Sequence, residues 1–211
     1  MLPRSATCSY NLGQFRLPSG KFNAFENDIR VPFIVRGPGV ARGTVREDVL
    51  VNNVDIAATV LELAGVAAPD YVHDGRSFAG QLAAAPAAAW TRDRLVFEYW
   101  GQGYTMRGPC HNGTTACPGG PEALEDAPSN TWSGLRILNA TMNVKYAEYR
   151  PAVASPIAPA STNFTLAFDL NADPSELVNA AGPGGSFSAA TLAQLSAELW
   201  AVATCAGAQC P

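Results

Sequence analysis

Residues 25–39 read Phe-Glu-Asn-Asp-Ile-Arg-Val-Pro-Phe-Ile-Val-Arg-Gly-Pro-Gly, and a loop that reads Leu-Pro-Ser-Gly-Lys precedes them at residues 17–21. The apolar run over residues 29–35 predicts a short strand that enters a tight turn. Pro32 has no backbone N–H to donate, so we expect it at the start of the strand or on a free edge. One lysine, Lys21, therefore lies in a Gly/Pro-rich loop ahead of a buried strand.

The chain that follows predicts one helix near this strand. Residues 49–54 form a second extended piece, and Asp55 has the side chain of a good N-cap. Apolar residues then recur at helical spacing over residues 56–64, and Gly65 is a suitable residue for the helix end. An alanine-rich stretch over residues 82–90 predicts a further short helix.

The second half of the chain predicts a sheet and a long helix. Alternating apolar and polar residues indicate strands over 94–100, 132–138, 143–149 and 164–170. They suit an antiparallel meander with one polar and one buried face. Residues 189–203 predict an amphipathic helix whose apolar side carries Leu192, Leu195, Leu199 and Val202.

These elements predict an α/β fold in two parts. Residues 1–65 resemble the end of an α/β sheet domain, and residues 66–89 form a connector. Residues 90–211 form a small antiparallel sheet that is covered by the C-terminal helix. The first part is too small to bury both faces of a parallel sheet by itself.

Composition excludes some classes of partner. The chain of 211 residues is 47% hydrophobic and 15% charged, with a net charge of −4. It holds no run of basic residues, which argues against binding to a nucleic-acid backbone. No apolar stretch is long enough to predict a membrane span. The first residues are not followed by the apolar region of a secretory signal, so none is predicted.

The cysteines and three glycosylation sequons nevertheless indicate an oxidising compartment. Cys110 and Cys117 form one pair, Cys205 and Cys210 form another, and Cys8 is left over. We favour two disulfides over a zinc site, because the spacing of paired zinc ligands is absent. Sequons begin at the asparagines Asn112, Asn139 and Asn163. Plain polar loops remain the alternative interpretation of the sequons, but together the features favour the secretory pathway.

The chain resembles the formylglycine-dependent sulfatases of the alkaline-phosphatase-like superfamily. The resemblance rests on residues 10–21, 28–39, 53–65 and 168–179, the last of which contains Asp-Pro-Ser-Glu. It is strongest to the branch of N-acetylglucosamine-6-sulfatases and algal-type arylsulfatases, which shares residues 97–103 and a terminal cysteine pair. It covers nearly the whole chain but matches only the C-terminal portion of such an enzyme.

The resemblance implies hydrolysis of a sulfate ester on a sulfated sugar or an aryl sulfate. The family uses a formylglycine nucleophile from a Cys/Ser-x-Pro-x-Arg motif and a calcium ion held by carboxylates and an asparagine. The motif does not occur in this sequence, and Thr7 and Cys8 occupy the positions of the last Asp-Asn metal pair. We therefore predict no metal ligands in this chain and little or no turnover without the missing N-terminal sulfatase half.

Lys21 aligns with the family lysine that contacts the sulfate group, and an ammonium suits an anionic oxygen. An ordinary solvated lysine is the alternative. Glu98 could contact sugar hydroxyls, although an exposed strand position also explains it. Arg30 is expected to pair with Glu26 or Asp28. A non-catalytic glycan-binding or scaffolding module, or a fragment without its own function, competes with the enzyme interpretation.

Overall fold

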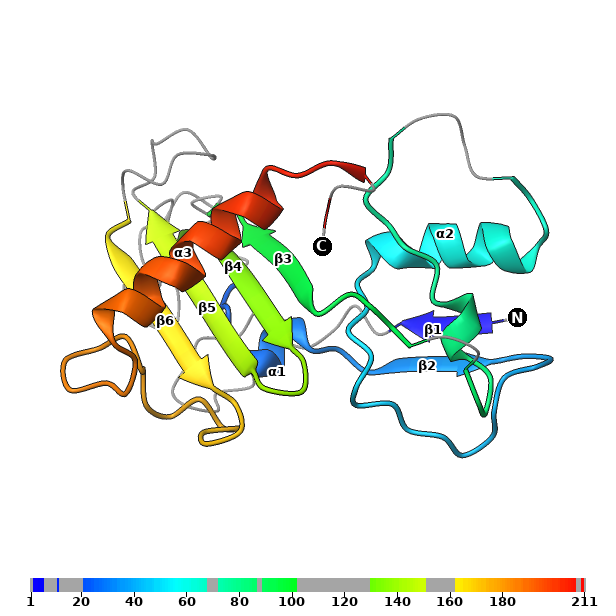
Figure 1. Cartoon of the computed structure of the whole chain (residues 1–211), viewed down its shortest axis with the longest axis horizontal. Helices are drawn as coiled ribbons and strands as arrows, with labels where there is room; N and C mark the ends of the chain where they lie inside the picture. The colour runs from blue at the N-terminus through cyan, green and yellow to red at the C-terminus, as the bar shows by residue number, and fades with distance from the viewer. Residues whose placement is uncertain are drawn as a thin grey trace, which may run out of the picture.

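The computed structural model describes residues 2–5, 11, 21–67, 72–86, 89–101, 130–150, 162–207 and 210. They form two groups of elements (Figure 1). One group holds strands β1 (Leu2–Ser5) and β2 (Phe33–Arg36) with helix α2 (Val54–Leu63). The other holds helix α1 (Glu26–Ile29), helix α3 (Ala189–Ala203) and the strands β3 (Arg94–Tyr99), β4 (Thr131–Leu138), β5 (Asn143–Arg150) and β6 (Phe164–Asp169).

The C-terminal sheet is an antiparallel meander in the order β3-β4-β5-β6, as predicted. Leu135 lies opposite Tyr146, and Ile137 lies opposite Val144. Each pair therefore points to the same side of the sheet, and the four side chains form the base of the main apolar core. The predicted strand boundaries agree with the observed ones to within one residue.

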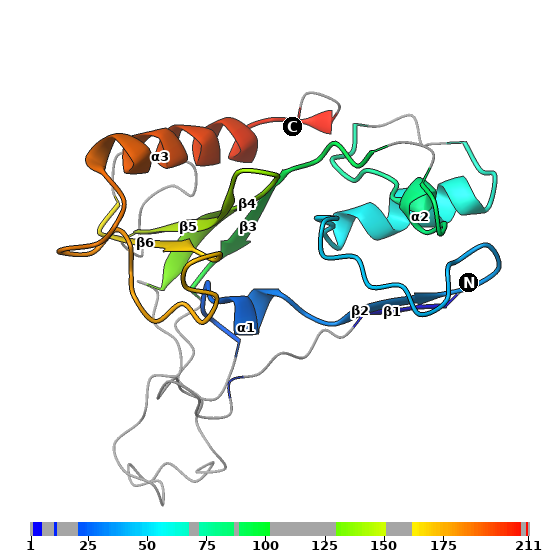
Figure 2. The same cartoon turned by 60° about the horizontal axis from the view of Figure 1, so that its bottom comes forward.

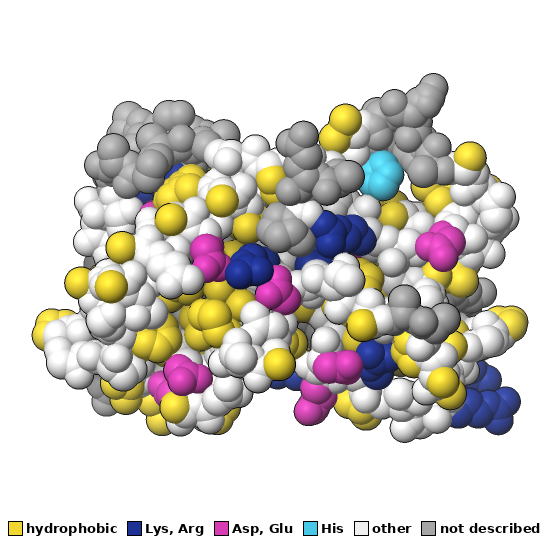
Figure 3. All heavy atoms as spheres, viewed as in Figure 1, with side chains coloured by type: hydrophobic (Ala, Val, Ile, Leu, Met, Phe, Trp, Pro, Cys, Tyr) yellow, Lys and Arg dark blue, Asp and Glu magenta, His cyan; other side chains and the backbone are white. Residues whose placement is uncertain are grey.

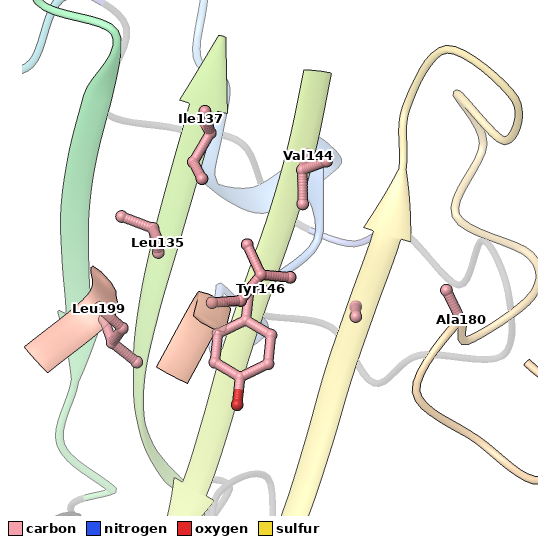
Figure 4. Packing of buried hydrophobic residues seen from close by; sticks show 8 residues of the cluster. Leu135, Ile137, Val144, Tyr146, Ala180 and Leu199 are labelled. Atoms are coloured by element: carbon pink, nitrogen blue, oxygen red, sulfur yellow. The ribbon is translucent and has the colours of Figure 1, made fainter. Parts of the chain in front are cut away.

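Helix α3 covers this side of the sheet (Figure 2). Leu195 and Leu199 are fully buried against the sheet residues, and Figure 4 shows Leu199 directed at Leu135 and Tyr146. The side chain of Ser188 caps the helix by accepting a hydrogen bond from the Thr191 N–H. The helix predicted over residues 189–203 is confirmed, and its apolar side is the one that packs.

The opposite side of the sheet is also covered, so the prediction of one polar face was wrong. Helix α1 and the residues before it lie against this side (Figure 2), where Ala24, Trp132 and Ala147 form a second buried cluster. Both faces of β4 and β5 are consequently buried along most of their length. The alternation of polar residues misled the prediction, because several of the polar side chains pair with one another inside the protein.

The strand predicted over residues 29–35 is shorter than expected. It begins only at Phe33, and α1 occupies residues 26–29 because the Phe25 carbonyl accepts hydrogen bonds from the Asp28 and Ile29 N–H groups. Pro32 directly precedes β2, as predicted for a residue without a donor. Residues 49–53 join no strand, so the second extended piece is not part of a sheet.

Helix α2 is confirmed with small differences at its start. Asn53, and not Asp55, is the N-cap; Asp55 lies buried in the first turn. Gly65 ends the helix with φ +66°, a conformation that favours glycine. The helix predicted over 82–90 was wrong, since the described residues in that range form bends and no helix. A 3₁₀ turn, η2 (Ala79–Gln81), ends just before it. Uniform alanines and Pro86 give that stretch no amphipathic face.

Within the described ranges, no helix combines the length and the apolar character that a bilayer crossing requires. The division of the chain at residues 65 and 89 stays a prediction. Residues 22–29 nevertheless pack on the C-terminal sheet and not on α2.

Candidate functional site

A cavity of about 1060 Å³ lies between the C-terminal sheet and the β2 part of the structure. Residues 29–35 and the loop around residues 40–53 line one side, and Leu95, Phe97 and Arg136 line the other. Lys21 is half-buried on its wall. The lining also carries Arg30, Arg46, Glu26 and Glu47, so the cavity combines apolar walls with more cationic than acidic side chains.

The backbone next to Lys21 is held by the sheet. The carbonyl of Phe22 accepts one hydrogen bond from Asn130 Nδ2 at 3.0 Å and another from Trp132 Nε1 at 3.1 Å. The Phe22 ring also packs on Tyr99, with 5.8 Å between ring centroids. Since Trp132 belongs to β4, a residue more than a hundred positions away fixes the main chain beside the lysine.

Asp28 is a buried acid that interacts electrostatically with Lys21. Its Oδ2 accepts hydrogen bonds from the Asn23 N–H at 2.9 Å and from Asn11 Nδ2 at 3.4 Å, whereas its Oδ1 is buried without a hydrogen-bond partner. Burial raises the pKa of the Asp28 carboxyl, and the contacts from Asn23 and Asn11 and the Lys21 ammonium offset part of that rise. Asn11 is itself fully buried and accepts from Asn27 Nδ2 at 2.5 Å.

A second charged cluster holds α1 on the sheet. Lys145 of β5 is 1% exposed and forms ion pairs with Glu176 and with Glu26, the latter at 3.4 Å. Arg136 Nε lies 3.4 Å from the same Glu26 oxygen, and the Glu26 N–H donates to Glu176 Oε2 at 2.6 Å. Burial lowers the pKa of the Lys145 ammonium and raises the pKa of the Glu176 carboxyl, while their attraction opposes both shifts.

The backbone of Glu176 has φ +56°, which is uncommon for a residue with a side chain. Glu176 is the last residue of the Asp-Pro-Ser-Glu turn. In this conformation its carboxylate forms an ion pair with Lys145 and accepts the hydrogen bond from the Glu26 N–H. The turn is stabilised in part by Asp173, whose carboxylate accepts from the Val178 N–H at 2.8 Å. This motif therefore has a structural partner in α1.

The expected pairing of Arg30 was wrong. Glu26 is turned toward Lys145 and Arg136, and Asp28 is turned toward asparagine side chains, so Arg30 forms an ion pair with neither acid. Arg30 is exposed and lies on the cavity lining instead.

Glu98 lies on the far side of the sheet from Lys21. It is exposed and accepts a hydrogen bond from Ser133 Oγ at 3.0 Å, and it is absent from the cavity lining, to which β3 contributes Leu95 and Phe97. The structure does not bring Glu98 and Lys21 together. The role of Glu98 as a sugar contact stays a prediction.

One of the two predicted disulfides is present. Cys205 is bonded to Cys210 just after α3. Asn139 is exposed in the hairpin between β4 and β5, and Asn163 is exposed at the start of β6. Cys110, Cys117 and Asn112 lie outside the described residues.

The described residues do not fit a calcium site. No three His, Cys, Asp or Glu side chains in this part of the chain come together as metal ligands. Beside Lys21 the donor set consists of the single carboxylate of Asp28 with asparagine amides, whereas calcium takes six to eight oxygen ligands.

Sequence reasoning missed the contacts that hold the lysine segment, including first that from Trp132 and second that from Lys145. The register shows a signal that could have indicated the second: Arg136 and Lys145 lie directly opposite each other in neighbouring buried strands. Like charges in that position destabilise a sheet unless acids lie between them. Such a pair therefore demands acidic partners from outside the sheet.

Comparisons with known proteins agree with this architecture. Residues 17–114 match the family model described as N-sulphoglucosamine sulphohydrolase, C-terminal. The chain is 32% identical over 206 residues to N-acetylglucosamine-6-sulfatase of Bos taurus, covering 95% of this chain and 34% of that protein. It is 28% identical over 223 residues to an arylsulfatase of Volvox carteri, covering 98% and 30%.

A solved structure of a 2-O GAG sulfatase shares the fold, with a TM-score of 0.53 and 20% identity over 83% of this chain and 30% of that one. The fold is thus that of a sulfatase. Over nearly its whole length the chain is similar to sulfatases, and it corresponds to the C-terminal portion of such a protein. It spans about a third of the length of the curated relatives that it matches.

Proposed function

We propose that this chain supplies the C-terminal part of a sulfuric ester hydrolase that acts on a sulfated sugar or an aryl sulfate. In this proposal Lys21 binds the sulfate group. One observation carries it: Lys21 is half-buried on the wall of a cavity that also carries Arg30 and Arg136. A fixed ammonium in a partly dry site stabilises the charge that builds on sulfate oxygens as the ester bond breaks.

The nucleophile and the calcium ligands belong, in this proposal, to a sulfatase segment outside this sequence. The relatives are about three times as long as the region that they share with this chain. The β2 and α2 part also exposes large apolar side chains: Ile34, Val45, Val54, Val60, Leu63, Val66 and Val72. Figure 3 shows hydrophobic atoms in yellow at several places on the right-hand half of one face. A packed sulfatase segment would remove this apolar surface from water.

Binding of inorganic sulfate and of glucosamine 6-sulfate to the purified chain tests the role of Lys21. We expect Lys21→Ala to weaken binding by about tenfold to a hundredfold, because a hydrogen bond to a charged group contributes on the order of 1.5–3 kcal/mol. Arg42→Ala is the matched control, since Arg42 is exposed and lies off the cavity lining. Equal loss in both variants would mean a general charge effect and would refute the proposal.

Turnover of 4-nitrophenyl sulfate with added calcium tests the second half of the proposal. We expect no turnover from this chain by itself and turnover once a complementary sulfatase segment is supplied. Turnover by the chain alone that Lys21→Ala abolishes would overturn the expectation of inactivity. Glycan binding that neither Lys21→Ala nor the added segment changes would favour the non-catalytic module.

We also propose passage through the secretory pathway. The Cys205–Cys210 disulfide and the exposed sequons at Asn139 and Asn163 support it, because disulfides persist in oxidising compartments. Mass spectrometry of the protein isolated from its source should show glycans on these two asparagines. Unmodified asparagines together with reduced cysteines would contradict it.

A further inference from the structure

We propose that Asn130 and Trp132 are positioning residues, which hold the segment carrying Lys21 so that its ammonium meets the sulfate at a fixed place. The inference rests on the proposed function, because it assigns the C-terminal sheet a task in sulfate binding beyond forming a wall. It starts from the Phe22 carbonyl, which accepts from both side chains at 3.0 and 3.1 Å.

Two side-chain donors on one carbonyl fix the peptide strongly. A carbonyl oxygen has two lone pairs, and both are used here by groups that are at least partly buried. The Trp132 ring cannot move away easily, since it packs against Phe97, Tyr99 and Tyr149 with centroids 5.7, 5.8 and 6.2 Å apart. The indole N–H is therefore a rigid reference point one peptide after Lys21.

The far end of the same segment is fixed independently. The Glu26 N–H donates to Glu176 at 2.6 Å, and the Glu26 carboxylate meets Lys145 and Arg136 at 3.4 Å. Between these two anchors the Asn23 N–H donates to the Asp28 carboxylate. The positive charge of Lys21 also stabilises the ionised form of that carboxyl. The loop is thus held at one end by the sheet and at the other by the sheet and the turn after β6.

This arrangement gives the sheet a specific effect on binding. Binding of sulfate by a flexible lysine orders its side chain and loop, which lowers the affinity. A segment ordered in advance avoids that loss. Removing the anchors should therefore weaken sulfate binding even when the chain stays folded. Loss of a contact that only stabilises the fold would leave the affinity of the folded protein unchanged.

The test compares four proteins: the full chain, Trp132→Phe, the double variant Asn130→Leu/Trp132→Phe, and Ile137→Val. Trp132→Phe keeps an aromatic ring in the cluster and removes the N–H donor, and the packing lost with the smaller ring is measured by the stability of the variant. Ile137→Val is the matched control, because Ile137 is fully buried on the other face and lies in the α3 core. Circular dichroism and urea unfolding show which variants are folded and how stable each one is.

The first measurement is amide hydrogen exchange in the peptide covering residues 22–30, whose N–H groups at Asp28, Ile29 and Arg30 are hydrogen-bonded. We expect about fivefold faster exchange in Trp132→Phe and about twenty-fivefold in the double variant, at roughly fivefold for each lost neutral hydrogen bond. Ile137→Val should leave the ratio of exchange between this peptide and α3 unchanged. Exchange that stays at the wild-type rate in both donor variants would overturn the anchor.

The second measurement is the affinity for inorganic sulfate. We expect the double variant to bind about tenfold more weakly than Ile137→Val at comparable stability. Faster exchange with wild-type affinity would show that the anchor does not position Lys21, and would refute the inference while leaving the proposed function intact. If Lys21→Ala binds sulfate as well as wild type does, the proposed function fails and the positioning of a sulfate contact fails with it, whereas the exchange data still decide whether the anchor exists.

Discussion

Replacing Lys145 by methionine should reveal how strongly the buried charges hold α1 on the sheet. Lys145 is 1% exposed and its partner Glu176 is 5% exposed at the side chain, so water cannot solvate the acid when the ammonium is removed. Methionine keeps most of the apolar length of the lysine. The substitution therefore tests the charge and leaves the packing of β5 largely in place.

The expected loss is about 3–5 kcal/mol in the free energy of unfolding near pH 7, the range for removing one partner of a buried ion pair. Burial already raises the pKa of Glu176, and loss of Lys145 raises it further. A carboxyl whose folded pKa is raised adds stability below its ordinary pKa and loses it as pH rises through the folded value. The defect should thus shrink toward about pH 5, by at most about 2.7 kcal/mol over two pH units.

Urea unfolding followed by circular dichroism at about pH 5 and pH 7 measures both effects. The double variant Lys145→Met/Glu176→Gln should recover part of the loss, because no buried charge is left without a partner on that side. Arg46→Met is the matched control on an exposed ion pair with Asp48, and we expect little change from it. A loss below about 1 kcal/mol for Lys145→Met, or one independent of pH, would refute the argument.

Three further predictions address other parts of the molecule. Asp28→Asn should gain stability relative to wild type as pH rises from about 3 to 7, because the raised pKa of Asp28 makes its ionised form unfavourable in the fold; parallel urea curves would contradict this. Replacing Cys205 and Cys210 by serine should cost about 2 kcal/mol in thermal unfolding, as expected for so short a loop, and reducing agent should then have no further effect. Leu199→Ala should cost about 2–5 kcal/mol by urea unfolding, whereas a smaller loss would mean that α3 is not packed as Figure 4 shows.

Local patterns predicted the regular elements of the C-terminal half well. The helix over 189–203 has apolar residues at helical spacing and a serine cap, and both signals lie within the helix itself. The strands of the meander alternate, and a short hairpin over residues 139–142 joins β4 to β5. Predictions failed where polar residues are buried, as at Asp55, which the Arg92 guanidinium contacts at 2.6 Å from 37 positions away.

The candidate site was predictable only in part. The loop before β2 indicated Lys21 through its resemblance to a family motif, and the structure places that lysine on a cavity wall. Glu98 was selected from its place on a strand, but strand periodicity cannot say which face of the sheet meets the cavity. That decision required the register with β4 and the packing of α3 on the same side as Glu98.

The amino-acid sequence by itself determined the resemblance to sulfatases, the order of the elements in the C-terminal half and the lysine that lies ahead of β2, because a short contiguous stretch carries the signal for each. Only the tertiary structure decided what holds that lysine. Trp132, Lys145 and Glu176 contact its segment from positions more than a hundred residues away. Such contacts depend on how the chain closes on itself, and no local spacing records them.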